Sequence, residues 1–265
     1  MQKYTNKFKK KFGQNFLRDT SIVQKIVREA NILEDSLVIE VGPGGAILTK
    51  ELAKVSKYVI AYEIDKDLEE QLNNKLRDCD NVDVIYNDFL ECDIIKDIKK
   101  YDYKHIYFIS NVPYYITTPI ILKLVNSGIK FDNIVMMVQK EVADRFSTNP
   151  GSKEYGSITV FLNYYYDVKS LFFVPREEFI PVPNVDSEVI SFIPKRELLN
   201  VKNFVVFEKL IKDSFKFKRK NLKNNLTGYH LDIIEEILKK HNFSLSTRAE
   251  ELSVEIFVEI ANAIV

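Results

Sequence analysis

The four residues Asn111, Val112, Pro113 and Tyr114 follow an apolar run that has the composition of a buried strand. An exocyclic aromatic amine, such as the N6-amino group of adenine, is a poor nucleophile because its lone pair is delocalised into the ring. Two acceptors on its hydrogens, the Asn111 side-chain oxygen and the Val112 backbone carbonyl, would draw the nitrogen toward tetrahedral geometry. Pro113 would fix the backbone, and Tyr114 offers a ring on which an extruded base can stack, whereas Tyr115 is assigned to packing. A type I turn with packed tyrosines explains these residues, taken alone, equally well.

A glycine-containing segment follows an earlier predicted strand. Glu40 precedes it, and Gly42 and Gly44 form a G-x-G pair, but Ile47 stands where the dinucleotide-binding fingerprint requires a third glycine. A pyrophosphate cradle is therefore incomplete, and an acid lies awkwardly beside phosphate. An acid followed by G-x-G suits a ligand with an amino group and a sulfonium, which indicates S-adenosylmethionine. On its own, the segment is explained equally well by a plain strand-to-helix turn.

Two more acids lie at predicted strand ends. Glu63 ends the second strand, where a carboxylate can accept hydrogen bonds from both ribose hydroxyls. Asp88 follows the third strand, where it could accept a hydrogen bond from the amino group of adenine. Each acid alone is explained by a helix N-cap or a solvated surface, but three acids at successive strand ends favour a nucleoside cofactor at the carboxyl edge of a sheet.

These residues require a parallel sheet to bring them together. Short segments rich in Val, Ile and Tyr alternate with amphipathic ones over the first two-thirds of the chain, which predicts βαβ units. The expected strands are residues 37–41, 58–64, 82–86, 105–110 and 133–140, and the expected helices are 48–57, 65–78 and 118–128. Two further strands, 157–168 and 187–194, are expected as an antiparallel pair at a sheet edge.

After Pro194 the pattern becomes helical. Ser253 is positioned as an N-cap of the last helix, whose apolar face consists of Ile256, Phe257, Ile260, Ala261 and Ile264. We therefore expect two domains: a cofactor-binding catalytic domain over residues 1–195 and a small helical domain over residues 196–265, whose basic run at 209–223 makes it the expected RNA-binding domain.

The formal net charge of the 265 residues is zero, but the charges are segregated. Residues 1–18 and 209–223 are strongly basic, whereas residues 62–102 are rich in acids. Such segregation can build a basic face on a neutral protein, although a solvated surface without a partner explains each run as well. The cations that we expect to contact RNA are Lys10, Lys11, Lys216, Lys218, Arg219 and Lys220.

Several classes of protein are disfavoured. The two cysteines match no metal-binding spacing, and three histidines leave little material for a metal site, so no metal is expected. No apolar run approaches the roughly 20 residues that a membrane span needs. The basic N-terminal segment lacks the apolar core of a secretory signal. We expect a cytoplasmic protein.

With these motifs, the chain resembles the small-subunit (16S) rRNA adenine N6-dimethyltransferases, the ribosome-biogenesis enzymes that also give kasugamycin sensitivity. The resemblance runs nearly end to end and is specific, because seven motifs occur in the right order. Beyond those above, the matching segments are 10–17, 138–146, 150–160, 174–190, 215–226 and 248–253.

The resemblance implies a Rossmann-like class I S-adenosylmethionine-dependent methyltransferase domain with a small C-terminal helical domain. It also implies that Gln14, Asn15 and Leu17 close over the cofactor, which Asn111 contacts too. Phe179 would stack on the target base opposite Tyr114. The implied substrate is two adjacent adenosines in the 3′-terminal hairpin loop of 16S rRNA, within the immature 30S subunit, and the implied enzyme is a monomer.

Three other functions share parts of this pattern. The nearest is a 23S rRNA adenine N6-methyltransferase of the macrolide-resistance type, with the same catalytic core; segments 138–145, 150–156 and 215–225 favour the small-subunit branch. A mitochondrial transcription factor derived from this fold is disfavoured by the intact tetrapeptide and by an N-terminus unlike a transit peptide. A non-catalytic ribosome assembly factor stays open as a second role.

Overall fold

A computed structural model describes residues 15–265, which fold as two compact units. Residues 15–143 and 169–194 form the first unit, and residues 144–168 and 195–265 form the second. The first unit thus ends close to the expected boundary at residue 195. Residues 144–168, which the sequence analysis assigned to the catalytic domain, group instead with the C-terminal helices, because Tyr155, Val160 and Tyr164 pack into the apolar core of the second unit.

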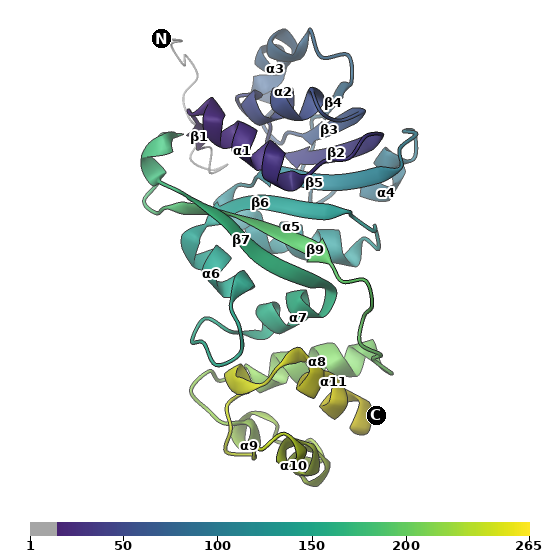
Figure 1. The fold of residues 1–265 in the computed structure, drawn as a ribbon, viewed down its shortest axis with the longest axis vertical. Helices are drawn as coiled ribbons and strands as arrows, with labels where there is room; N and C mark the ends of the chain where they lie inside the picture. Colours follow the sequence, from purple (N-terminus) through teal and green to yellow (C-terminus); the bar gives the residue numbers. More distant parts are fainter. Residues whose placement is uncertain (1–14) are drawn as a thin grey trace. The chain divides into compact units, whose positions relative to one another are not determined.

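The first unit is built on a sheet of seven strands in the order β4-β3-β2-β5-β6-β9-β7 (Figure 1). All the pairings from β4 to β6 are parallel, and β9 runs antiparallel to β6. The strands are β2 Ser36–Val41, β3 Tyr58–Tyr62, β4 Val82–Ile85, β5 His105–Asn111, β6 Asn133–Gln139, β7 Tyr166–Val174 and β9 Ser187–Pro194. The five predicted parallel strands and the strand at 187–194 are confirmed, so the polar strand ends do lie along one edge.

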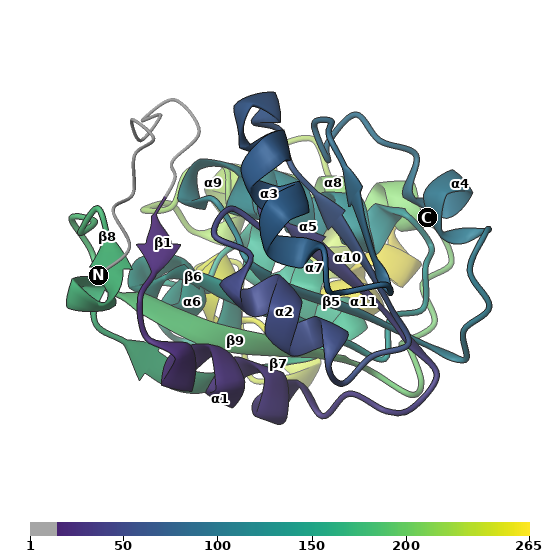
Figure 2. The ribbon, with the colours of Figure 1, turned by 90° about the horizontal axis from the view of Figure 1, so that it is seen from above.

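Helices cover one face of this sheet with a shared apolar core. α1 Thr20–Ala30 contacts α2 Ile47–Ala53 and β6, and Figure 2 shows α1 and α2 side by side. α3 Glu69–Leu76, preceded by η2 Lys66–Leu68, packs beside them against residues of β4. The core under α1 and α2 includes Ile26, Val38, Leu52, Tyr107, Ile109, Val135 and Met137.

The opposite face carries α4 Ile94–Ile98 and α5 Thr117–Asn126. Phe108 points to this face because it alternates with Tyr107 along β5. The ring of Phe89 lies 6.0 Å from that of Phe108 and 5.1 Å from that of Tyr62. α5 connects β5 to β6 and lies behind the sheet in Figure 1, so the segment that leaves β5 at Asn111 is anchored by a helix with one buried face.

One predicted strand is wrong. Residues 157–168 were expected to be extended, but α7 covers Ser157–Tyr165, and only then does β7 begin. The backbone N–H of Gly156 donates to the hydroxyl of Thr159 at 3.1 Å, which caps the helix start. Val160 and Tyr164, four residues apart, then face the core of the second unit. A short apolar run rich in aromatic residues is compatible with a helix or a strand, and here packing against the core of the second unit favours the helix.

The second unit is helical. Its segments are residues 144–147 at the end of α6 Lys140–Ser147, α7, α8 Phe204–Ser214, α9 Leu222–Asn225, α10 Leu231–Lys240, η5 Ala249–Glu251 and α11 Val254–Ala263. The predicted apolar face of the last helix is confirmed, since Ile256, Phe257, Ile260 and Ala261 are buried in one core with α7, α8 and α10. The fifth predicted member, Ile264, is partly buried against the same core.

Candidate active site

The glycine loop between β2 and α2 forms the floor of a cavity at the carboxyl edge of the sheet. Gly42 and Gly44 have φ values of 76° and 45°, which favour glycine. The Gly42 N–H donates to the Tyr62 carbonyl at 2.8 Å. A Cβ on Gly44 would lie 2.6 Å from the ring of Phe16, so the second glycine also allows an aromatic side chain to approach the loop.

Glu40 lies beneath this loop and is the most deeply buried acid of the site, 2% exposed. Burial raises the pKa of its carboxyl to about 8, and the nearby Glu63 adds to the rise, against an opposing contribution from the Thr49 hydroxyl. Its Oε2 atom has no hydrogen-bond partner among residues 15–265. A buried carboxyl oxygen without a partner is costly unless a ligand supplies a donor. The site therefore fits a ligand that carries an amino group.

Glu63 follows β3 and is also buried. Its Oε2 accepts from the Gly44 N–H at 3.3 Å and its Oε1 from the Asp65 N–H at 2.9 Å. Burial is the main cause of a raised pKa at this carboxyl, partly offset by those two backbone donors. The carboxylate thus fixes the glycine loop and lines the cavity, as the strand-end argument predicted.

Asp88 lies between two residues that line the cavity, but it is not itself part of the lining. Its neighbours Asn87 and Phe89 line the cavity, whereas the Asp88 Oδ1 accepts from the Leu90 N–H at 2.9 Å. The loop that carries them is held from α5, where Lys123 Nζ donates to the carbonyls of Leu90 at 2.8 Å and Cys92 at 2.6 Å. Lys123 was not recognisable in the sequence, because its two partners are backbone carbonyls, which leave no sequence pattern.

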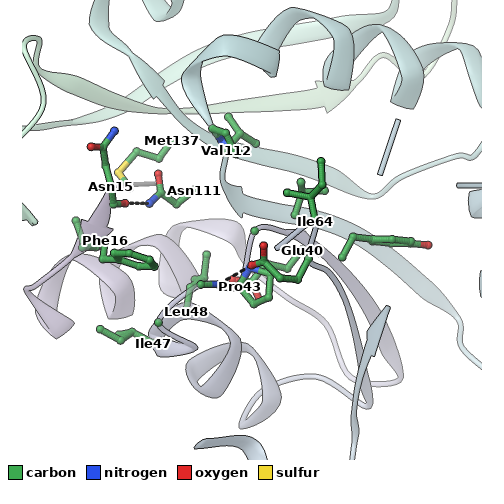
Figure 3. Close-up of a pocket in the computed structure, with 18 of the residues that line it drawn as sticks. Asn15, Phe16, Glu40, Pro43, Ile47, Leu48, Ile64, Asn111, Val112 and Met137 are labelled. Carbon is green, nitrogen blue, oxygen red and sulfur yellow. Dashed lines mark hydrogen bonds between the residues drawn. The ribbon is translucent and has the colours of Figure 1, made fainter. Parts of the chain in front are cut away.

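The tetrapeptide comes at the end of β5 and forms the opposite wall of the cavity (Figure 3). Asn111 Nδ2 donates to the backbone carbonyl of Asn15 at 3.4 Å. With the amide nitrogen engaged there, the amide oxygen is the atom that can accept from a substrate amine. A Cβ atom placed on Gly42 would lie 3.9 Å from the ring of Pro113, so the tetrapeptide and the glycine loop lie against each other.

Tyr114 is held by a residue that the sequence analysis did not single out. Its hydroxyl shares a hydrogen bond of 2.5 Å with the hydroxyl of Ser187, a buried residue at the start of β9. Tyr114 lines the cavity, and burial raises the pKa of its phenol. The assignment of Tyr115 to packing is wrong, because its side chain is 53% exposed. It follows Tyr114 in a single 3-10 turn, η3 Tyr114–Ile116, in which Tyr114 and Ile116 are half-buried.

The expected position of Phe179 differs from the structure. β8 Phe179–Ile180 pairs antiparallel with β1 Phe16–Leu17, so that Leu17 faces Phe179. Phe179 is fully buried in the apolar core under α1, and it does not line the cavity. A β strand turns alternate side chains to opposite faces. The ring that lines the cavity is instead that of Phe16, which was not recognisable in the sequence, and Asn15 lies beside it (Figure 3). Leu17 also belongs to the lining of the cavity.

The sequence model of a known family matches nearly the whole chain. It is described as ribosomal RNA adenine dimethylase and covers residues 5–265. The chain belongs to the ribosomal RNA adenine dimethylase family. A protein of Bacillus pumilus is 42% identical over 273 residues, which span all of this chain and 94% of the relative. One of Clostridioides difficile is 43% identical over 269 residues, which span all of this chain and 93% of the relative. Both are named ribosomal RNA small subunit methyltransferase A.

Solved structures agree on the fold. The 23S rRNA methyltransferase ErmE superposes with a TM-score of 0.76 at 25% identity, over 94% of this chain and 99% of that one. A dimethyladenosine transferase from Plasmodium falciparum gives 0.75 at 24% identity, over 92% of this chain and 95% of that one. The predicted family, the Rossmann-like class I α/β fold and the assignment as an rRNA adenine methyltransferase are therefore confirmed.

The remaining predicted site residues belong to the second unit or lie outside the described residues. Lys216, Lys218, Arg219 and Lys220 are exposed in the second unit. Gln14, Lys10 and Lys11 lie outside the described residues. Over residues 15–265, no group of three or more His, Cys, Asp or Glu side chains is arranged to hold a metal ion. In the same range, no helix is both long and apolar enough to cross a membrane.

Proposed function

We propose that this protein transfers methyl groups from S-adenosylmethionine to the N6-amino groups of two adjacent adenosines in the 3′-terminal hairpin loop of 16S rRNA, within the immature 30S subunit. The observation that carries the proposal is the Asn111 amide, which is held by the Asn15 carbonyl on one wall of the cavity whose floor covers Glu40. The number and address of the adenosines rest on the family resemblance.

The residues present fit the cofactor. Glu40 would receive the amino group of the methionine part, since it has a buried oxygen in need of a donor. Glu63 would accept from the ribose hydroxyls, and the Asp88 loop, held by Lys123, would flank the adenine. The bound cofactor supplies an electrophilic methyl group on a sulfonium.

The protein would act on the amine by orientation. The Asn111 side-chain oxygen and the Val112 carbonyl accept hydrogen bonds from the two N–H groups of the amine, so that the nitrogen lone pair turns toward the methyl group. The nitrogen would bond to that methyl group as the bond from the methyl carbon to sulfur breaks, and the sulfur would keep the electron pair. The amine then carries a positive charge and loses a proton to water. No general base is needed before attack, and Tyr114 supplies a face on which the extruded base stacks.

A large-subunit substrate is the second candidate, because ErmE shares the fold over nearly its whole length. Its identity to this chain is 25%, against 42% and 43% for the two small-subunit enzymes. The smaller divergence favours the small-subunit substrate. We further propose that the enzyme acts in the cytoplasm as a monomer, with the first unit catalytic and the second in contact with RNA.

The test is methylation of purified, unmethylated small and large subunits with labelled cofactor, followed by mapping of the modified base. We expect two adjacent N6,N6-dimethyladenosines near the 3′ end of 16S rRNA and no label in 23S rRNA. Label confined to 23S rRNA would support the macrolide-resistance function instead. Calorimetry with the methyl donor and with NAD separately tests the cofactor, and binding of NAD alone would contradict its assignment.

A further inference from the structure

The basic segment of the second unit forms a loop whose backbone is held by hydrogen bonds. Between α8 and α9, residues 215–221 wrap around the side chain of Asn225, which is buried. Asn225 Nδ2 donates to the carbonyls of Ser214 at 2.8 Å, Phe217 at 3.2 Å and Lys220 at 3.3 Å. Its Oδ1 accepts from the Phe217 N–H at 3.1 Å. One amide therefore ties the start, the middle and the end of the loop.

The backbone of the loop is fixed at two further points. The Lys220 N–H donates to the Phe217 carbonyl at 2.8 Å, which closes a tight turn at the tip. Beyond the loop, the N–H groups of Leu222 and Lys223 donate to the carbonyls of Thr247 at 2.9 Å and Leu245 at 3.0 Å. The loop thus has a defined shape before any partner arrives, which lowers the entropy that binding must remove.

Two phenylalanines of the loop have opposite environments. The ring of Phe215 points inward and lies 6.2 Å from that of Tyr155 and 6.0 Å from that of Phe257. Phe217, two residues later, is 54% exposed at the tip. Because the same amide holds the backbone on both sides of Phe217, its exposure follows from the construction of the loop. A single exposed apolar side chain is ordinary on a protein surface, so the function of Phe217 depends on what surrounds it.

The charges around Phe217 indicate what it binds. Lys216, Lys218, Arg219 and Lys220 are all exposed, and Lys216 Nζ lies 5.6 Å from the centre of the Phe217 ring. The nearby Asp213 is engaged by Lys209 at 2.6 Å and by the Tyr229 hydroxyl at 2.7 Å. An aromatic ring among cations suits a single-stranded nucleic acid, in which bases stack while phosphates contact the cations.

We propose that the 215–221 loop is a binding site for unpaired RNA, in which Phe217 stacks on a base, the four cations contact phosphates, and Asn225 is the positioning residue of the loop. The proposal rests on the proposed function only in taking rRNA as the partner. It goes beyond it by assigning a second base contact, in a different unit from the methyl-transfer cavity.

The test uses the full-length protein and protein-free 16S rRNA, with binding measured at several salt concentrations. Phe217→Ala should weaken binding about 5- to 20-fold, within the range of one lost stacking contact. It should leave the dependence of affinity on salt unchanged, since no phosphate contact is lost. Phe217→Tyr, which keeps a ring face, should bind like the wild type. Phe173→Ala removes a comparably exposed phenylalanine from β7 of the first unit and should have no effect.

Asn225 is tested by a double-mutant cycle. Asn225→Ala should weaken RNA binding, and Phe217→Ala should cost little more in that background, because a loosened loop no longer presents the ring. A purely structural role would lower the urea midpoint of Asn225→Ala but leave the effect of Phe217→Ala undiminished, which would overturn the positioning role.

The outcomes separate the loop from the proposed function. If the wild type methylates 16S rRNA and Phe217→Ala binds it equally well, the inference fails while the function stands. A loss seen only with whole subunits, and not with protein-free rRNA, would mean a protein contact and also overturns it. If the wild type methylates 23S rRNA instead, the function fails, and the same comparison on that RNA still decides the loop.

Discussion

The cavity of the first unit and the 215–221 loop of the second use charge in opposite ways. In the cavity, the carboxyls of Glu40 and Glu63 are buried, and burial raises the pKa of both. In the loop, the cations are exposed to water around a scaffold tied by one neutral amide. Buried charges interact strongly at short range, whereas exposed charges act through counterion release. The cavity is therefore suited to selecting one small ligand, and the loop to holding a long polyanion.

This difference implies that the two regions can be impaired separately. Changes in the cavity should alter the chemical step or the capture of the cofactor and leave the salt dependence of RNA binding intact. Changes in the loop should do the reverse.

The largest expected effect is on the chemical step. Asn111→Ala removes one of the two acceptors that align the amine, and the single-turnover rate should fall on the order of a hundredfold or more. RNA affinity and its salt dependence should be unchanged. Asn126→Ala, an exposed amide at the end of α5, is the matched control and should retain the rate. Near-wild-type rates with lost cofactor affinity would make Asn111 a cofactor ligand only.

The next effect is on RNA binding. Replacing Lys216, Lys218, Arg219 and Lys220 by Gln should reduce the salt slope by roughly one unit per lost phosphate contact. If two to four contacts are lost, affinity near 0.15 M salt should fall about ten- to a hundredfold. Cofactor affinity measured by calorimetry should not change. The control, Lys239→Gln with Lys240→Gln on α10, removes exposed cations of the same unit. An unchanged slope in the quadruple variant would mean that the loop is solvated surface.

The third effect is a pH dependence that belongs to the cavity alone. Glu40 has an ordinary value of 4.5 when unfolded and a pKa of about 8 when folded, so the folded state binds the proton more tightly. Its contribution to stability is fully present below about pH 4.5 and is lost as the pH rises through about 8. Conversely, a cationic ligand amine needs the ionised carboxylate, so cofactor affinity should increase from pH 6 toward 8, by up to about tenfold per unit.

Glu40→Gln should remove both trends. Urea unfolding of the ligand-free protein between pH 5 and 8.5 measures the first, and calorimetry over the same range measures the second. Glu91→Gln, a change at an exposed glutamate, should leave both trends in place. Cofactor affinity that is flat with pH in the wild type would show that Glu40 does not receive the amine.

The comparison also explains what a sequence can reveal. Glu40, Gly42, Glu63 and Asn111 were found because each stands at the end of a locally recognisable strand, and parallel strands end at one edge. Asp88 was expected in the same way, but its carboxylate accepts a backbone N–H in its own loop instead of lining the wall. A strand-end position therefore predicts a place in the fold more reliably than the direction of a side chain.

Contacts between distant segments were not recognisable. Ser187 is 73 positions from the tyrosine that it holds, and Phe16 reaches the glycine loop only because β1 pairs with β8. The role of Asn225 could not be predicted for a related reason, since its partners are backbone carbonyls. The aromatic run at 157–165 became a helix because its neighbours in space, and not its own pattern, decided the period.

The smallest expected effect concerns the hydrogen bond between Tyr114 and Ser187. A tyrosine that only offers a ring face would tolerate Tyr114→Phe, but this change leaves the buried Ser187 hydroxyl without its partner and frees the ring to tilt. A net hydrogen bond is worth about 1 kcal/mol, so the single-turnover rate should fall roughly fivefold. Ser187→Ala should cause a similar loss, and the double variant should be no slower than either single one, because all three lack the same bond. Tyr114→Ala, which also removes the stacking face, should be clearly slower than Tyr114→Phe.

A looser ring should also increase the fraction of monomethyladenosine, measured by mass, since the second transfer must realign an amine that has one hydrogen left. Cofactor affinity and the RNA salt slope should be unaffected in every variant. Additive losses in the double variant would show that Ser187 acts on the rate by another route, and the positioning of Tyr114 would then belong to its packing alone.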